Sequence, residues 1–182
     1  MSNRIVIGGP KNCGKSTLAA SIYNRLKDLS VSVGIYEIDV FSDTIPCILG
    51  IKPWVQRQKR ESGNWRDPLI DLRLDDFSRD GSHIVLGDLP GIIDELLKKM
   101  VLFATAAIAI GKNEETLEEW LDFFNRQSIP VILRIGSYLG EGCGWMPRKA
   151  LPDFFHVGNM NRQVLRNEEI YTVVNWLLGL CR

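Results

Sequence analysis

The chain has 182 residues, of which 45% are hydrophobic and 24% charged, and this size and composition predict one globular domain with a full core. Lys plus Arg and Asp plus Glu number 22 each, so no overall charge draws the molecule towards nucleic acid or a membrane surface. The longest apolar run, residues 100–110, is shorter than the roughly 20 residues that a membrane span needs, and no signal peptide is evident, so we expect a cytoplasmic protein. The four scattered cysteines indicate neither a disulfide framework nor a zinc site.

Short apolar runs alternate with amphipathic stretches along the chain, a pattern typical of β–α units around a parallel sheet. In chain order we predict a strand at 4–8, a helix at 15–29, strands at 31–39, 83–88 and 104–110, a helix at 113–127, strands at 129–135 and 154–157, and a helix at 167–180. Two long segments, 50–82 and the Gly- and Pro-rich 136–152, interrupt this pattern and are expected to carry specificity. We therefore predict a single three-layer α/β domain over residues 1–182, with a mostly parallel sheet and an irregular insert at about 50–82.

The segment from Gly9 to Ser16 reads Gly-Pro-Lys-Asn-Cys-Gly-Lys-Ser and matches the phosphate-binding Walker A pattern, between a predicted strand and a predicted helix. Its glycines let successive N–H groups turn into one concavity at the positive end of the helix dipole. We expect Lys15 to reach the β- and γ-phosphates of a nucleoside triphosphate and the Ser16 hydroxyl to bind Mg²⁺. The residues expected to bind the nucleotide here are Gly9, Pro10, Lys11, Asn12, Cys13, Gly14, Lys15, Ser16 and Thr17.

A second candidate element, Asp88-Leu-Pro-Gly91, follows an apolar predicted strand. An acid at that strand end can hold a magnesium-bound water, so Asp88 joins Ser16 as a predicted metal residue. The Gly91 N–H could approach the γ-phosphate and report its presence. An ordinary turn is the alternative, because Asp, Pro and Gly favour turns in any context.

The third element, Glu37-Ile-Asp39, ends the second predicted strand. Alternation along a strand puts both carboxylates on one face, at the edge of a parallel sheet where ligands usually bind. Asp39 is a candidate to orient a water, to accept a proton from an acceptor hydroxyl, or to help hold the metal. The alternative is a structural role as a helix cap or a salt-bridged strand end.

With these residues the chain resembles the P-loop NTPases of the SIMIBI class, which includes the MinD/ParA ATPases, signal-recognition GTPases and dethiobiotin synthetase. The resemblance runs from the first strand to about Ser137 and implies a P-loop fold in which the Walker A and Walker B strands are adjacent. One departure is Pro10, which stands where MinD/ParA members carry a signature lysine, with Lys11 one place later.

A more local resemblance is to the polynucleotide 5′-hydroxyl kinases, which have a loop similar to that from Gly9 to Thr17 and a strand similar to Glu37-Ile-Asp-Val40. Residues 133–137 read Leu-Arg-Ile-Gly-Ser, where GTPases commonly carry Asn-Lys-x-Asp, so ATP is favoured over GTP. The nearby Gly111-Lys-Asn113 is interpreted as the start of a helix.

Residues 52–66 combine five basic residues with two tryptophans and a single acid. This composition suits nucleic-acid binding, a lid over the γ-phosphate, a protein partner, or a plain surface helix. Residues 67–80 carry five aspartates, which could neutralise that basic segment and so weaken the case for nucleic acid. The glycine-rich residues 140–147 form either a base-contacting loop or a simple connection.

The sequence favours a magnesium-dependent NTPase, using ATP, whose hydrolysis switches a conformation or a partner. In this reading Lys15, Asp39 and Asp88 are the catalytic residues. The alternatives are a kinase that transfers the γ-phosphate to a hydroxyl, with Asp39 as general base, and a nucleotide-binding module without turnover. The Trp- and Leu-rich last helix is a candidate surface for a homodimer.

Overall fold

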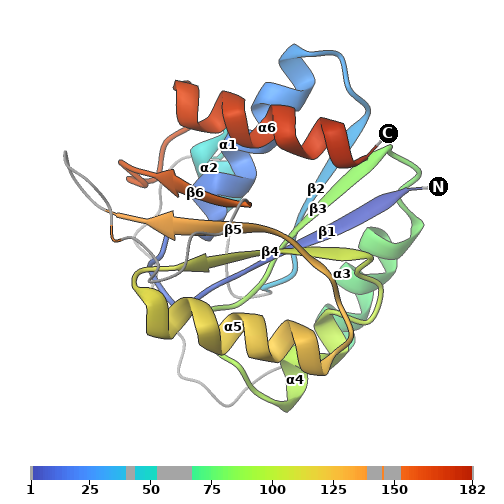
Figure 1. The fold of residues 1–182 in the computed structure, drawn as a ribbon. Helices are drawn as coiled ribbons and strands as arrows, with labels where there is room; N and C mark the ends of the chain where they lie inside the picture. Colours follow the sequence, from blue (N-terminus) through green and yellow to red (C-terminus); the bar gives the residue numbers. More distant parts are fainter. Residues whose placement is uncertain (1, 40–43, 53–66, 139–144, 146–152, 182) are drawn as a thin grey trace.

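A computed structural model describes residues 2–39, 44–52, 67–138, 145 and 153–181. The elements in chain order are β1 (Asn3–Gly8), α1 (Lys15–Asp28), β2 (Val33–Glu37), α2 (Thr44–Ile48), α3 (Asp67–Arg79), β3 (Ile84–Asp88), α4 (Glu95–Met100), β4 (Ala106–Gly111), α5 (Glu114–Arg126), β5 (Val131–Ser137), β6 (Phe154–Val157) and α6 (Glu168–Leu180). The six strands form one sheet in the order β2-β3-β1-β4-β5-β6, and every pair is parallel (Figure 1).

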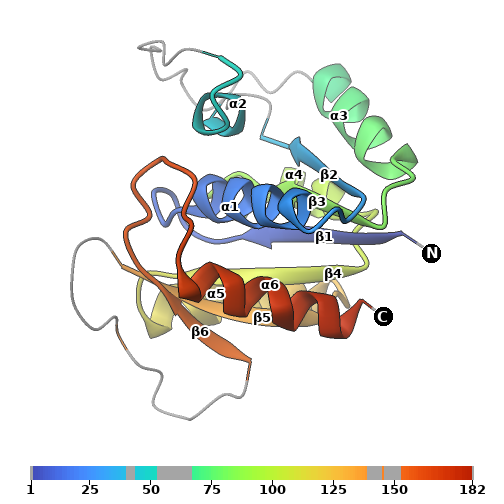
Figure 2. The ribbon, with the colours of Figure 1, turned by 90° about the horizontal axis from the view of Figure 1, so that it is seen from above.

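Helices cover both faces of this sheet, which gives three layers (Figures 1 and 2). Successive side chains of a strand point to opposite faces, and β1 follows this rule: Ile5 and Ile7 pack in one core with α1 and α6, while Val6 packs in the other. The second core is built from α3, α4 and α5. Because β1 is buried on both faces, its apolar run holds the following loop on a rigid base.

The predicted three-layer α/β class is confirmed, and the sheet is parallel throughout. The two strands expected to lead into the Walker elements are neighbours, with Asn3 paired to Ile84 and Ile7 paired to Asp88. Gly8 and Asp88 therefore end at the same edge of the sheet. In the part of the chain that the structure describes, no helix has the length and apolar character needed to cross a membrane.

The segment expected to be irregular, 50–82, differs from that expectation because its second part forms α3. Ile70, Leu74 and Phe77 recur at helical spacing and are buried in the second core, so burial of this stripe stabilises the helix despite its acidic residues. The short helices α2 and α4 were also not predicted. The predicted strand at 31–39 is shorter, ending at Glu37.

Two side chains of the sheet attach the C-terminal end of α3 by hydrogen bonds. The Arg4 guanidinium of β1 donates to the main-chain carbonyls of Phe77 and Ser78, at the negative end of the helix dipole. The Tyr36 hydroxyl of β2 donates to Asp80 at 2.9 Å. Since the C-terminal end of α3 lies at the edge of the sheet where β3 begins, its first turn lies towards the opposite edge, where Gly8 and Asp88 end.

Candidate nucleotide and metal site

The loop between β1 and α1 leaves the N-terminus of α1 without a side-chain cap. Gly14 is the N-cap residue, with φ of 90°, and it makes no side-chain hydrogen bond to the helix. Asn12 is also in the left-handed region, with φ of 58°. Since no side chain accepts from the first amides of α1, they can donate to an anion, and the helix dipole favours one there.

Lys15 is nearly buried, with 8% of its surface exposed, and its ammonium lies within the loop. Its Nζ donates to the main-chain oxygens of Gly9 at 2.9 Å and Pro10 at 3.0 Å. Neither partner is an acid, so the positive charge of Lys15 is not neutralised by an ion pair among the described residues. A phosphate bound in the loop would interact directly with the Lys15 ammonium.

Ser16 and Asp88 meet across the loop. The Ser16 hydroxyl donates to Asp88 Oδ2 at 2.5 Å, and Asp88 is 2% exposed. Its other oxygen, Oδ1, is buried and has no hydrogen-bond partner within the described ranges. A buried carboxylate oxygen without a partner costs about 1–3 kcal/mol or more, so a bound group that contacts Oδ1 would remove this cost.

Burial raises the pKa of Asp88 to about 7, against the lowering effect of the Lys15 charge and of the Ser16 hydrogen bond. The neighbouring charges of Glu37 and Asp39 raise the pKa further. A divalent cation at this point would favour the ionised carboxylate.

The donor set fits Mg²⁺, which takes oxygen ligands and usually combines one or two protein side chains with phosphates and waters. Ser16 Oγ and the unpartnered Asp88 Oδ1 are such oxygens. No group of three or more His, Cys, Asp or Glu side chains gathers as a metal site in the described part of the chain, so an all-protein cage is not built there.

The two acids at the end of β2 have different surroundings. Glu37 is buried, and its Oε1 accepts from the Ile45 amide at 2.8 Å, so this carboxylate holds the start of α2. The structural alternative considered from the sequence therefore describes Glu37. Asp39 follows the strand and is half-buried, and its amide donates to the Asp88 carbonyl at 3.4 Å. Asp39 thus lies beside the Ser16–Asp88 pair.

Gly91 lies directly against the phosphate loop. A Cβ placed on Gly91 would come within 2.5 Å of the Lys11 amide nitrogen and 2.8 Å of its Cα. Real Cβ atoms do not approach a backbone so closely, so the segment after Asp88 can make this contact only with glycine. The contact brings the turn after β3 against the loop after β1.

Two further residues of the loop are buried. Cys13 is 3% exposed, and burial raises the pKa of its thiol despite the opposing charge of Lys15. A buried, protonated thiol reacts poorly, which favours a packing role over redox sensitivity. Thr17 is buried in the first turn of α1, where its carbonyl accepts from Ser21.

The segment after β6 also supports the loop, and no sequence motif predicts this contact. Met160 is buried against Gly14: a Cβ on this glycine would lie 2.6 Å from the Met160 Cβ. The Leu165 amide donates to the Ser21 hydroxyl of α1 at 2.9 Å. No motif marks Met160, so only the tertiary structure reveals this contact.

Two predicted segments lie largely outside the described residues, namely 53–66 and most of 140–147. Trp145 is described: its indole donates to the Gly111 carbonyl at 3.3 Å and contacts the Phe154 ring at 5.2 Å between centroids. Gly111-Lys-Asn113 does begin a helix, as predicted, because Asn113 is the N-cap of α5.

Solved structures of three proteins share this architecture. A putative plasmid partition protein from Borrelia burgdorferi B31, bound to AMPPNP, has a TM-score of 0.60 and 13% identity over 98% of this chain and 99% of that one. The septum site-determining protein MinD from Pyrococcus horikoshii OT3, complexed with Mg-ADP, has a TM-score of 0.56 and 14% identity over 75% and 70%. Chloroplast FtsY from Physcomitrella patens has a TM-score of 0.51 and 15% identity over 76% and 50%.

The chain therefore shares its three-layer α/β fold with a MinD, a plasmid partition protein and an FtsY, and the fold that the sequence predicts is confirmed. At such low identity the likeness concerns the fold. No protein-family model and no curated protein sequence matches the chain. The resemblance to polynucleotide 5′-hydroxyl kinases stays a prediction.

Proposed function

We propose that this protein is a magnesium-dependent NTPase that uses ATP and works as a nucleotide-driven switch. The observation that carries the proposal is the hydrogen bond between Ser16 and the buried Asp88 at the N-terminus of the uncapped helix α1. A hydroxyl and a carboxylate with an unpartnered oxygen are placed there beside the Lys15 charge.

The phosphates would bind to the loop from Gly9 to Thr17, with its amides and the first amides of α1 as donors. Lys15 would exchange its contacts with the carbonyls of Gly9 and Pro10 for the β- and γ-phosphates. This exchange is favourable because a charge-assisted hydrogen bond to phosphate is stronger than one to a neutral carbonyl.

Ser16 and Asp88 would hold Mg²⁺, which would offset the negative charge of the phosphates. Asp39 would orient the attacking water, since it lies beside the Ser16–Asp88 pair and is half-buried. Gly91, which lies against Lys11, would report the γ-phosphate through its main chain. Loss of that phosphate would change the contact between the two loops, and this change is the switch.

Two observations favour ATP. The sequence Leu-Arg-Ile-Gly-Ser at residues 133–137 differs from the guanine-reading Asn-Lys-x-Asp. Two of the proteins with the same fold were solved with adenine nucleotides, AMPPNP and Mg-ADP. Competition of ATP, GTP, CTP and UTP against a fluorescent ATP analogue measures the preference, and stronger competition by GTP would contradict it.

The proposal is tested by following γ-labelled ATP with wild type and the Asp39→Asn variant, in Mg²⁺ and in EDTA. We expect slow release of labelled phosphate by wild type in Mg²⁺, and its loss in EDTA and in Asp39→Asn. ATP binding should persist in Asp39→Asn. Tight binding with negligible hydrolysis by wild type, alone and with a partner, would instead identify a non-hydrolysing nucleotide-binding module.

A kinase is the second candidate, favoured by the half-buried position of Asp39 beside the pair, where it could act as general base for an acceptor hydroxyl. Adding short 5′-hydroxyl RNA and DNA oligomers to the same assay discriminates between the two. Label on an oligomer, lost in Asp39→Asn, would establish the kinase and a nucleic-acid substrate. Label only in free phosphate would favour the switch, and then a protein partner or a second copy of the chain.

A further inference from the structure

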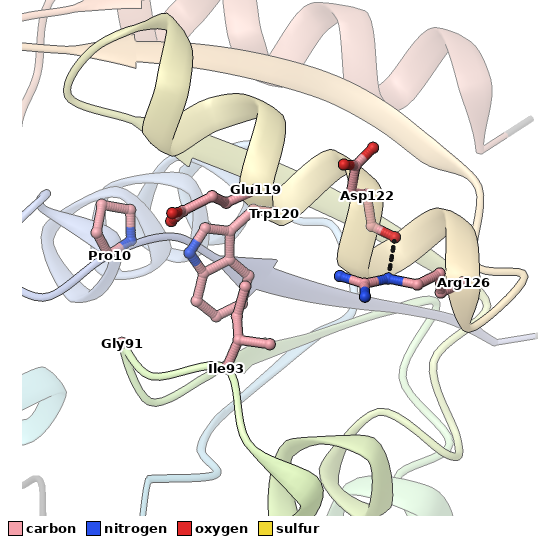
Figure 3. Close-up of a pocket in the computed structure, with 7 residues that line it drawn as sticks. All are labelled: Pro10, Gly91, Ile93, Glu119, Trp120, Asp122 and Arg126. Carbon is pink, nitrogen blue, oxygen red and sulfur yellow. Dashed lines mark hydrogen bonds between the residues drawn. The ribbon is translucent and has the colours of Figure 1, made fainter.

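A hollow of about 440 Å³ lies between α5 and the segment that joins β3 to α4 (Figure 3). Its lining includes Pro10 of the phosphate loop and Gly91, together with side chains from α5. Neither Ser16 nor Asp88 lines it, so the hollow is distinct from the proposed metal position. It nevertheless shares two residues with the proposed nucleotide site.

One wall of the hollow is apolar and firmly held. Ile93 and the Pro10 ring form its accessible surface, and Figure 3 shows the indole of Trp120, which is only 2% exposed, lying between them. Trp120 is fixed by Phe123 and Phe124, at centroid distances of 5.9 and 5.8 Å. Ile93, in contrast, is 38% exposed, although it is a large apolar residue. A rigid apolar wall beside an exposed isoleucine suits an incoming apolar side chain.

The rim of the hollow is acidic. Glu119 and Asp122 are exposed, and neither carboxylate has a hydrogen-bond or ion-pair partner in the described part of the chain. Arg126 donates to the main-chain oxygen of Asp122 at 3.2 Å and so leaves that carboxylate without a pair. The whole helix α5, Glu-Glu-Thr-Leu-Glu-Glu-Trp-Leu-Asp-Phe-Phe-Asn-Arg, carries five acids and one base.

We infer that this hollow is the docking site for a segment of a protein partner in which an apolar side chain stands beside Lys or Arg. The apolar side chain would pack on Ile93 and the Pro10 ring, above the buried Trp120, and the basic one would pair with Glu119 and Asp122. A simple cation would gain nothing from contact with the apolar wall. An anionic membrane or nucleic acid would be repelled by the acidic residues of α5. A protein segment satisfies both features.

Docking here is coupled to the nucleotide site, and this step rests on the proposed function. Gly91 and Pro10 line the hollow, and Gly91 packs on the backbone of Lys11. A partner would therefore contact both loops whose separation the γ-phosphate is proposed to control. By linkage, a nucleotide that changes partner affinity is itself bound more tightly or weakly by the same factor.

The test uses the full chain, labelled with ¹⁵N, and synthetic peptides as probes. The basic peptide is acetyl-Gly-Arg-Leu-Arg-Gly-amide; one control has Glu in place of Arg, and another has Ala in place of Leu. We expect the basic peptide to shift the amide resonances of Ile93, Glu119 and Trp120 without nucleotide. The Glu peptide should cause no shift, and the Ala peptide should bind more weakly. Absence of shifts with the basic peptide would overturn the inference.

Two variants with the same charge change locate the binding. Glu119→Lys should weaken the basic peptide by about fivefold or more, because an attraction becomes a repulsion. Glu118→Lys, exposed on the same helix but outside the hollow, should change the affinity by less than about twofold, since exposed charges act weakly beyond their contacts. An equal loss of peptide affinity in both variants would show a general charge effect and would overturn the proposed docking site. A dimer of the chain that Glu119→Lys abolishes would show a second copy as occupant, and would equally overturn the inference.

The coupling has its own readout, so its failure can be told from that of the proposed function. Peptide affinity is measured for wild type and Lys15→Ala, each with and without Mg-ATP. Each affinity with Mg-ATP is compared with the nucleotide-free value of the same protein. Mg-ATP should change the affinity of wild type by at least about threefold and that of Lys15→Ala not at all. Failure of wild type to bind ATP contradicts the proposed function alone, whereas ATP binding without any change in peptide affinity overturns the coupling alone.

Discussion

Two neighbouring strands of the sheet, β1 and β4, are each followed by a helix, but the two turns are built differently. Asn113 caps α5 by accepting from the Thr116 amide at 2.9 Å, and Thr116 Oγ1 accepts in return from the Asn113 amide at 3.3 Å. The first turn of α5 also carries two acids. Gly14, in contrast, begins α1 without a side-chain cap, and the first turn has no acid. The residues of the turn therefore decide whether the N-terminal amides of a helix are capped by a side chain, which stabilises the fold, or remain available to bind an anion.

The largest effect is expected when the lysine in each turn is replaced in turn by alanine. Lys15→Ala should weaken ATP binding on the order of 100-fold, because charge-assisted hydrogen bonds to phosphate contribute about 1.5–3 kcal/mol each. Lys112→Ala, in the turn before α5, should leave the affinity unchanged. Titration with a fluorescent ATP analogue measures both. If Lys112→Ala weakened binding as much as Lys15→Ala, the two turns would not differ as described.

A methyl group on Gly91 should have the next largest effect. Gly91→Ala has no room beside the Lys11 backbone, so the two loops must separate, and we expect nucleotide affinity or hydrolysis to fall by about tenfold. Gly179→Ala, in α6, has no atom within 4 Å of the new Cβ and serves as the control. The same titration and γ-labelled ATP measure the two effects. Full activity in Gly91→Ala would remove Gly91 from the switch.

Removal of the cap on α5 should affect stability and leave the nucleotide alone. Asn113→Ala should lower the free energy of unfolding by about 1 kcal/mol, because the Thr116 amide loses its acceptor. Urea denaturation, with ATP affinity measured on the same preparation, separates these quantities. A loss of ATP affinity without a loss of stability would place a ligand contact at the α5 turn.

A pH dependence of stability comes from the α1 side of the comparison. Burial raises the pKa of Asp88 to about 7, so its contribution to folding is complete below its unfolded pKa of about 4 and is lost as the pH rises through 7. In EDTA without nucleotide, the free energy of unfolding should therefore fall over this range, and Asp88→Asn should reduce the slope. Denaturation curves between pH 5 and 8 measure it, and identical slopes for the two proteins would rule out Asp88 as the source.

The elements around the phosphate loop could be predicted because their residues act locally. Gly9, Gly14 and Lys15 stand at a fixed spacing that only a strand–turn–helix context allows, and the apolar strands are buried on both faces. Asp88 was found for the same reason, as the acid at the end of such a strand. The class of fold followed from these features.

The remaining features depend on tertiary contacts. The apolar stripe of α3 consists of Ile70, Leu74 and Phe77. Five aspartates surround it, and their charge obscures the helical spacing of the apolar residues in the sequence. The hollow beside Trp120 joins residues from three separated segments, and no local pattern could reveal it. The contact between Met160 and Gly14 likewise joins residues that are 146 positions apart in the chain (160 − 14).

The central place of β1 in the sheet also bears on how the protein is made. Its two partners are residues 84–88 and 106–111, so β1 has neither neighbour when it is synthesised. At roughly 5–20 residues per second, Ile5, Val6 and Ile7 wait on the order of 5–20 s before the ribosome has added β4. The strand that leads into the phosphate loop is therefore synthesised before both of its neighbours, and its pairing is completed late. During synthesis it is a segment that chaperones would need to shield, and nucleotide can stabilise the fold only after this step.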